Sequence, residues 1–178
     1  NITTDELDKK NMIIISPDTG AMDRAIYYSN ILKQDIGLFY KRRDYTKVVD
    51  GKNPIIEHKY IGREVEGKDI LIVGDMIASG GSVIDIAKQL KKQNANRIFC
   101  AVSFALFTEG PEKFDQMNKE GYIDGVYSTN LTYVPEEIKN KDWFHAVDMS
   151  ELMSEFILHI NREESISILL DKTRGINI

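Results

Sequence analysis

The sequence predicts an α/β fold built around a mainly parallel β-sheet. Short apolar runs rich in β-branched residues alternate with stretches whose apolar residues recur at helical spacing. Strands that alternate with helices form right-handed βαβ units, and these give a parallel sheet flanked by helices. The length of 178 residues fits one such domain with a sizeable core.

The apolar runs define the expected strands. In chain order they cover residues 12–15, 36–40, 69–73, 97–104, 126–127 and 146–147. Tyr60-Ile61 is expected to form a further short strand on a minor sheet. The polar, charged stretch 41–54, with glycine and proline near its end, is expected to be an exposed loop or flap.

The intervening stretches carry apolar residues at helical spacing. Helices are expected at 21–32, 82–93, 111–120 and 150–161, with a shorter amphipathic piece at 164–170. In the second of these, Val83, Ala87 and Leu90 are expected to face the core. Ser82 and Asp85 have the spacing of a capping box, which predicts that this helix begins at Ser82.

Composition narrows the classes of function. The chain has 23 basic and 28 acidic residues, a net charge of −5, which argues against non-specific nucleic-acid binding. No apolar run approaches the roughly 20 residues that a membrane span needs. The one cysteine, Cys100, excludes a disulfide framework and suits a cytoplasmic location; its mid-strand position predicts a buried apolar role.

The strongest candidate site is the turn that follows the strand at 69–73. Asp75 stands at the strand end, and Ser79-Gly80-Gly81-Ser82 leads into a helix. Glycines allow a tight turn, and the amides and dipole of a helix N-terminus favour a phosphate. The sequence therefore predicts an anion site here, although an ordinary βα turn with Ser82 as a cap gives the same pattern.

Two further strand ends carry polar residues. Ser16-Pro17-Asp18-Thr19-Gly20 is a second glycine turn before a helix, and on its own it is better explained by Asp18 or Thr19 acting as the helix cap. Lys41-Arg42-Arg43 opens the polar stretch and is either a solvated charge cluster or a cationic flap that closes over phosphates. The carboxyl ends of strands are where α/β sheets bind ligands, so the three segments together favour phosphate chemistry.

Together these segments resemble the C-terminal half of the ribose-phosphate pyrophosphokinase family, which has the type I phosphoribosyltransferase fold. The resemblance covers residues 12–170. Its most specific parts are Lys41-Arg42-Arg43 and, near the C-terminus, Glu163-Glu164-Ser165-Ile166-Ser167. It implies a three-layer domain at 11–178 and an interdomain segment at 1–10, with an N-terminal domain and further subunits of a homo-oligomer as partners.

The resemblance also implies a reaction, the transfer of pyrophosphate from ATP to ribose 5-phosphate with Mg²⁺ to give phosphoribosyl diphosphate. Ser79, Gly80, Gly81 and Ser82 would hold the 5-phosphate, and Asp75 would orient the ribose directly or through hydrated magnesium. Asp18, Thr19 and Gly20 would form the pyrophosphate loop. Lys41 and Arg43 would act catalytically by neutralising the reacting phosphates. The ATP contacts are expected from outside this half, so the chain alone is expected to be inactive.

Two departures from the family pattern leave the function open. The family's loop has a pair of adjacent acids where this chain has Gly74 followed by Asp75, and another aspartate where this chain has Ala78. The loss removes acceptors for the sugar and a possible metal contact. The alternatives are therefore an active synthetase, a non-catalytic regulatory homologue, and a phosphoribosyltransferase that uses a base.

Overall fold

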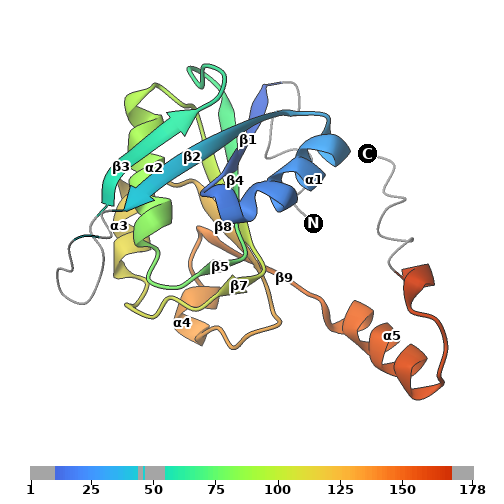
Figure 1. Cartoon of the computed structure of the whole chain (residues 1–178). Helices are drawn as coiled ribbons and strands as arrows, with labels where there is room; N and C mark the ends of the chain where they lie inside the picture. The colour runs from blue at the N-terminus through green and yellow to red at the C-terminus, as the bar shows by residue number, and fades with distance from the viewer. Residues whose placement is uncertain (1–10, 44–45, 47–54, 170–178) are drawn as a thin grey trace.

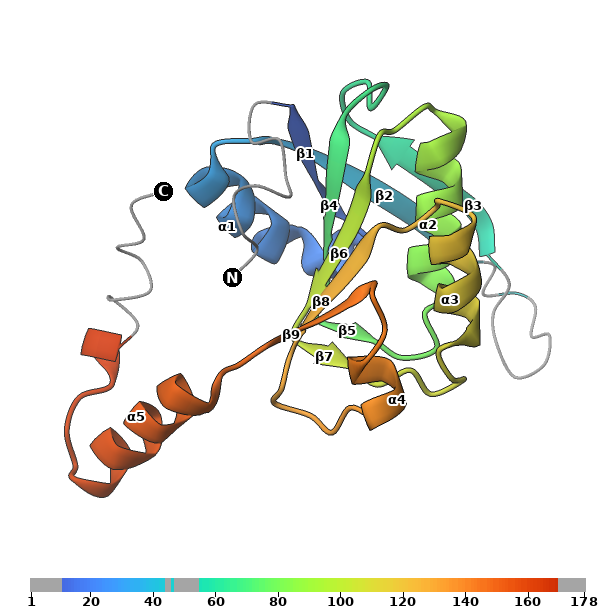
Figure 2. The same ribbon diagram turned by 180° about the vertical axis from the view of Figure 1, so that it is seen from behind.

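A computed structural model describes residues 11–43, 46 and 55–169 (Figures 1 and 2), with the backbone alone at 41–43 and 55–58. The prediction for 1–10, and most of the polar stretch after Arg43, lie outside the described residues. Among the helices of this part, none is long and apolar enough to cross a membrane.

The main sheet has seven strands in the order β3-β2-β1-β4-β6-β8-β9. All neighbours in it are parallel except β2 and β3, which are antiparallel. The strands are β1 (Met12–Ser16), β2 (Asp35–Arg43), β3 (Ile55–Ile61), β4 (Asp69–Val73), β6 (Ile98–Val102), β8 (Gly125–Thr129) and β9 (Phe144–Val147). The predicted mainly parallel α/β fold is confirmed.

Helices cover both faces of this sheet. The helices of the described part are α1 (Met22–Leu32), α2 (Gly81–Lys92), α3 (Glu112–Lys119), α4 (Glu136–Lys139) and α5 (Ser150–Asn161), and a 3-10 turn, η1 (Thr19–Ala21), precedes α1. Figures 1 and 2 show α1 on one face and α2 and α3 on the other. The helices predicted at 21–32, 82–93, 111–120 and 150–161 are confirmed apart from small shifts at the ends, and α4 was not expected. Of the piece predicted at 164–170, only residues 167–169 are helical, and residue 170 lies outside the described part.

The core follows from the alternation of side chains along each strand. Ile70 and Ile72 of β4 join the cluster under α2, whereas Leu71 and Val73 join the cluster under α1. All five residues of β4 are buried, as a strand covered on both faces requires. This is why the central strands read as unbroken apolar runs in the sequence.

Three predictions need correction. Tyr60 and Ile61 belong to the antiparallel edge strand of the main sheet, not to a minor sheet, because β3 pairs with β2 from Leu38–Ile61 to Arg43–Ile55. Residues 41–43 are the last part of β2 rather than a loop. The strand predicted at 97–104 ends at Val102, and Phe104–Ala105 forms β7, which pairs with β5 (Met76–Ile77) in a separate two-stranded sheet.

Candidate functional site

The turn between β4 and α2 is shaped by Gly80. Its φ is 82°, in the left-handed region that favours glycine. A Cβ at this position would lie 2.3 Å from Cε2 of Phe114, so a side chain is excluded by contact as well as by backbone conformation. The backbone therefore reverses tightly against an aromatic ring and starts α2 at Gly81.

The ring behind Gly80 is itself held firmly. Phe114 is buried and stacks on Trp143 with 5.6 Å between the ring centroids. Trp143 Nε1 donates a hydrogen bond to Asp115 Oδ1 at 2.8 Å, and Lys141 Nζ donates to Oδ2 at 2.7 Å. The hydrogen bond from Lys141, followed by that from Trp143, lowers the pKa of the Asp115 carboxyl. This aromatic wall fixes the position of the turn.

The first turn of α2 begins without a capping side chain. The Ile84 N–H donates to Gly80 O at 3.0 Å. Amides before this position have no carbonyl partner within an α-helix, and the helix dipole adds positive potential there. The capping box predicted from Ser82 and Asp85 is wrong, because Gly80 occupies the cap position and Ser82 is the second helical residue.

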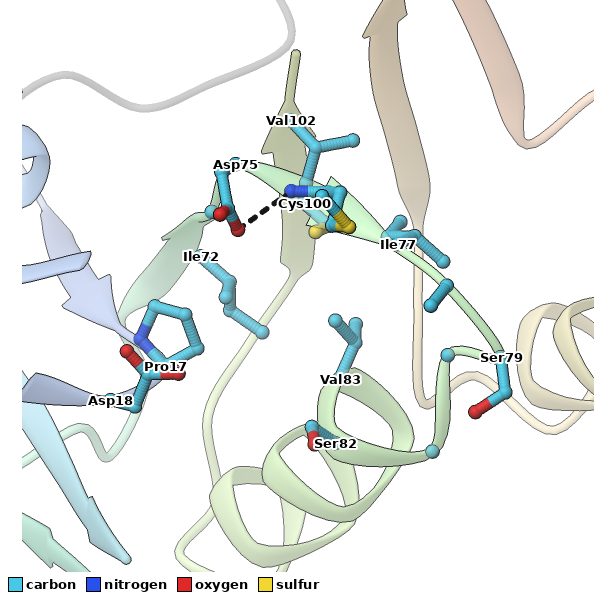
Figure 3. A pocket seen from close by; sticks show the side chains of 15 residues that line it. Pro17, Asp18, Ile72, Asp75, Ile77, Ser79, Ser82, Val83, Cys100 and Val102 are labelled. Carbon is cyan, nitrogen blue, oxygen red and sulfur yellow. Dashed lines mark hydrogen bonds between the residues drawn. The ribbon is translucent and has the colours of Figure 1, made fainter. Parts of the chain in front are cut away.

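A cavity of about 190 Å³ opens in front of this helix start. Figure 3 shows Ser79 and Ser82 on the α2 side of the cavity and Pro17 and Asp18 across from them. The residues predicted to hold the 5-phosphate all line it, together with both predicted acids: Asp18, Asp75, Ser79, Gly80, Gly81 and Ser82. The structure thus brings together two of the three segments that the sequence singled out.

Asp75 is held by its backbone while its side chain stays exposed. Its carbonyl oxygen accepts from the N–H groups of Ser103 and Phe104, each at 3.0 Å. Its Oδ1 accepts from the Met76 N–H at 2.8 Å (Figure 3). One carboxylate oxygen thus has a backbone donor, and the exposed carboxylate can still accept from a sugar hydroxyl or from a water on a hard cation.

Gly74 and Ala78 line the same cavity as Asp75. A Cβ on Gly74 would lie 3.4 Å from Val102 Cγ1 and 3.9 Å from Pro17 Cγ, so the backbone leaves room for a side chain. Ala78 is exposed. Packing at these two positions therefore does not explain why the sequence has no acid there.

The turn between β1 and α1 has a different arrangement. Asp18 Oδ1 accepts a hydrogen bond from the Ala21 N–H at 3.0 Å and so caps η1, as the simpler interpretation of this turn expected. Ser16 Oγ donates to the Asp18 carbonyl oxygen at 2.7 Å, which tightens the turn. Thr19 and Gly20 are exposed, and the cavity lining includes Asp18 but neither of these two.

Lys41 and Arg43 lie at the end of β2. β1 ends at Ser16, opposite Leu38, so the backbone of 39–43 continues beyond the carboxyl end of β1. The pairing with β3 shifts register between Arg42 and Arg43. The cationic segment therefore leaves the sheet at the edge where the two glycine turns lie, and its side chains are outside the described part.

Several residues of the cavity were not expected from the sequence. Cys100 and Val102, from β6, and Ile77, from β5, form its inner wall (Figure 3). Burial raises the pKa of the Cys100 thiol to about 12, so the thiol stays protonated and acts as an apolar wall. β5 and β7 hold the turn through the Leu106 N–H, which donates to Ile77 O at 2.8 Å. A two-residue strand has no periodicity from which to predict it.

A mainly parallel sheet with a glycine turn and a cavity at the start of α2 is the arrangement of α/β domains that bind ligands at the carboxyl ends of their strands. The sequence profile of the phosphoribosyl transferase domain family matches residues 1–132. The chain belongs to this family.

Within it, the chain is similar to ribose-phosphate pyrophosphokinases. It is 30% identical over 169 residues to that of Mycoplasma pneumoniae and 31% identical over 168 residues to that of Mycoplasma genitalium. These matches cover 94% and 93% of this chain but 49% and 48% of the relatives. The chain therefore spans about half the length of the curated relatives it matches.

A solved structure shows the same fold. The phosphoribosylpyrophosphate synthetase from Mycobacterium smegmatis superposes with a TM-score of 0.71 at 20% identity. The superposition covers 90% of this chain and 47% of that one. The type I phosphoribosyltransferase fold is thereby confirmed.

Proposed function

We propose that this chain is the ribose 5-phosphate-binding half of a ribose-phosphate pyrophosphokinase. The observation that carries the proposal is the cavity at the start of α2, where Ser79, Ser82 and the first-turn amides face Asp75 across a space of about 190 Å³. The amides and hydroxyls suit a phosphate dianion, and the carboxylate suits a ribose hydroxyl. Homology to the synthetases extends over the whole of this site.

In the proposed reaction the 1-hydroxyl oxygen of ribose 5-phosphate attacks the β-phosphorus of ATP. A bond forms between these two atoms, the bridging bond from the β-phosphorus to the α-phosphate oxygen breaks, AMP leaves, and the hydroxyl proton is released. Such transfers depend mainly on positioning and on stabilising charge. The α2 turn anchors the sugar phosphate, and Lys41 and Arg43 are proposed to neutralise charge on the transferred group.

Magnesium fits the site as a substrate-bound ion. The described residues contain no group of three or more His, Cys, Asp or Glu that could hold a metal on their own. Magnesium commonly keeps several waters and uses one or two carboxylates plus substrate phosphates, and the exposed Asp75 carboxylate can serve in that way. When bound, the ion would neutralise phosphate charge, and Asp75 would orient its waters.

Calorimetric titration of the chain with ribose 5-phosphate, with and without Mg²⁺, tests whether the site binds the sugar phosphate. Saturable binding is expected. Replacing Ser79→Ala together with Ser82→Ala should weaken it about 10-fold to 100-fold, because two hydrogen bonds to a charged group are lost. Ser154→Ala, at an exposed serine of α5, is the matched control. A folded chain that does not bind the sugar phosphate contradicts the proposal.

The role of the cationic segment is tested in a full-length synthetase that contains this half. Lys41→Ala is expected to lower kcat far more than it raises KM for ribose 5-phosphate, because its proposed role is in the transition state. Equal turnover in variant and parent would exclude Lys41 from catalysis. The 178-residue chain alone is expected to form no phosphoribosyl diphosphate from ATP, because the proposed ATP contacts come from the other half.

The second candidate function is a non-catalytic regulator that binds the same ligand, and Gly74 and Ala78 favour it. Gly74→Asp with Ala78→Asp restores both acids, and the backbone at Gly74 leaves room for one. A full-length protein that is inactive and gains synthetase activity with these acids would establish the regulator. Substantial activity with Gly74 and Ala78 in place would exclude it.

A further inference from the structure

The wall of the cavity at the start of α2 has a buried apolar part. Its buried side chains are Ile72, Ile77, Val83, Cys100 and Val102, each of them at most 8% exposed (Figure 3). Four of the five are hydrocarbon, and the fifth is the protonated thiol of Cys100, which is only a weak donor and acceptor. This part of the wall therefore offers a sugar hydroxyl no strong hydrogen-bond partner.

The polar side chains of the cavity lie at its exposed rim. Among the described residues that line it, Asp18 and Asp75 carry the carboxylates, and Ser79 and Ser82 carry the hydroxyls. Both aspartates and Ser82 are exposed, and Ser79 is half-buried. Water therefore reaches both carboxylates when no ligand is bound.

One oxygen of each carboxylate already has a backbone donor. Asp75 Oδ1 accepts from the Met76 N–H at 2.8 Å, and Asp18 Oδ1 accepts from the Ala21 N–H at 3.0 Å. These bonds hold each side chain against its own turn and leave mainly the second oxygen, Oδ2, for a ligand. Each carboxylate is thus an exposed acceptor that is shared between its own backbone and whatever enters the cavity.

The exposure of an acceptor decides how strongly it selects for a hydroxyl. A buried acceptor loses its partner when the hydroxyl is missing, so a site built on such groups rejects the analogue by about 10⁴-fold or more. An exposed carboxylate takes up a water molecule instead, and an apolar wall discriminates only weakly between a hydroxyl and a hydrogen. The acceptors of this cavity are exposed and its buried wall is apolar, so neither favours ribose strongly over a deoxy sugar.

The phosphate end of the cavity serves both sugars equally. The first-turn amides of α2, Ser79 and Ser82 are proposed to bind the 5-phosphate, and hydrogen bonds to a charged group are the stronger kind. 2-Deoxyribose 5-phosphate carries the same phosphate and keeps the 1-hydroxyl that the proposed reaction uses. The two sugars differ only at the 2-position.

We infer that the cavity binds 5-phosphorylated pentoses with little selectivity for the 2-hydroxyl, so that it accepts 2-deoxyribose 5-phosphate as well as ribose 5-phosphate. This inference rests on the proposed function, since it requires that the cavity hold a sugar phosphate. It extends the substrate class of the site from ribose to deoxyribose.

Calorimetric titration of the chain with each of the two sugar phosphates tests the inference. The two dissociation constants are expected to differ by no more than about 10-fold, because the loss is at most one hydrogen bond to an exposed acceptor. A larger difference would overturn the inference but leave the binding of ribose 5-phosphate, and with it the proposed function, intact. A folded chain that binds neither sugar would contradict both.

Variants at Gly74 test the physical reason for the low selectivity. Gly74 is buried in the cavity wall, where a Cβ would lie 3.4 Å from Val102 Cγ1 and 3.9 Å from Pro17 Cγ. Gly74→Asp adds an acceptor that water reaches poorly, so it is expected to raise the preference for ribose 5-phosphate above 10-fold. Gly74→Ala is the matched control, because it fills the same space without an acceptor and should leave the ratio of the two dissociation constants unchanged.

The ratio in these variants decides whether the exposure of the acceptors sets the selectivity. A rise in Gly74→Asp alone supports the inference. An unchanged ratio in Gly74→Asp, or an equal rise in Gly74→Ala, would overturn it. Should Gly74→Asp lose its fold, Gly74→Ser places a smaller acceptor at the same position, with the same expected direction and the same outcomes.

Discussion

The two glycine turns at the carboxyl edge of the sheet have similar sequences but different physical roles. In both, a buried strand leads into a turn with an acid, hydroxyls and glycine, and a helical segment follows. In the β1 turn the Asp18 carboxylate accepts from the Ala21 N–H at 3.0 Å, so the turn supplies its own anion. In the β4 turn the cap residue is Gly80, and no side chain caps α2.

The difference shows what makes such a turn a binding site. A side chain that caps the helix occupies an amide that a phosphate would use and adds a negative charge beside it. A glycine cap leaves that position to a ligand, provided that the rest of the structure holds the turn in place. Phe114 and the two-stranded β5–β7 sheet supply that support for the β4 turn.

Substitution of Gly80 is expected to have the largest effect on the β4 turn. Gly80→Ala should lower the free energy of unfolding by about 2 to 4 kcal/mol, from the positive φ and from the clash with Phe114. Gly81→Ala is the control, because its Cβ would come no closer than 3.9 Å, to Ser79 Oγ. Urea denaturation measures both, and equal losses in the two variants would contradict the role given to Gly80.

Removal of the cap in the β1 turn is expected to have a smaller effect. Asp18→Ala should cost about 1 kcal/mol of stability, since a capping hydrogen bond is lost. Asp18→Asn keeps an acceptor oxygen and should cost less than about 0.5 kcal/mol. Thermal unfolding of the two variants separates the contribution of the hydrogen bond to the Ala21 N–H from that of the Asp18 charge. A larger loss for asparagine than for alanine would show that Asp18 stabilises the turn by another interaction.

Acid should weaken the support of the β4 turn. The pKa of the Asp115 carboxyl is lowered in the folded state by its hydrogen bonds to Lys141 and Trp143. A lowered pKa gives stability that is present above the unfolded value of about 4 and is lost as pH falls through the folded value. Melting temperatures measured as pH is lowered below about 4 should therefore fall less steeply in Lys141→Met than in the parent. Equal slopes would exclude this contribution.

Much of the fold could be predicted because the central strands are buried on both faces. A strand that is buried on both faces is an unbroken apolar run in the sequence, as residues 70–73 show. The edge strand β3 was misplaced because its antiparallel pairing with β2 depends on how the intervening chain returns, which no local pattern shows. β5 and β7 were missed because two residues are too few to show alternation.

The candidate site was predictable to the level of segments but not of contacts. The strand end and the glycines predicted that Asp75 and residues 79–82 form one site, and these residues line one cavity. The helix was predicted to begin at Ser82, and the close approach of Gly80 to Phe114 could not be found, because Phe114 is 34 residues further along the chain. The walls from Cys100 and Val102 likewise come from a neighbouring strand that only the sheet order brings close.

The most direct test of the difference between the two turns is a titration of the ¹⁵N-labelled chain with ribose 5-phosphate, followed by amide chemical shifts. The largest shifts are expected at Gly81, Ser82 and Val83, where α2 begins at the cavity. The Ala21 amide, already bonded to Asp18, should move much less. Largest shifts at 19–21, or no shift at the start of α2 at saturating ligand, would contradict the account.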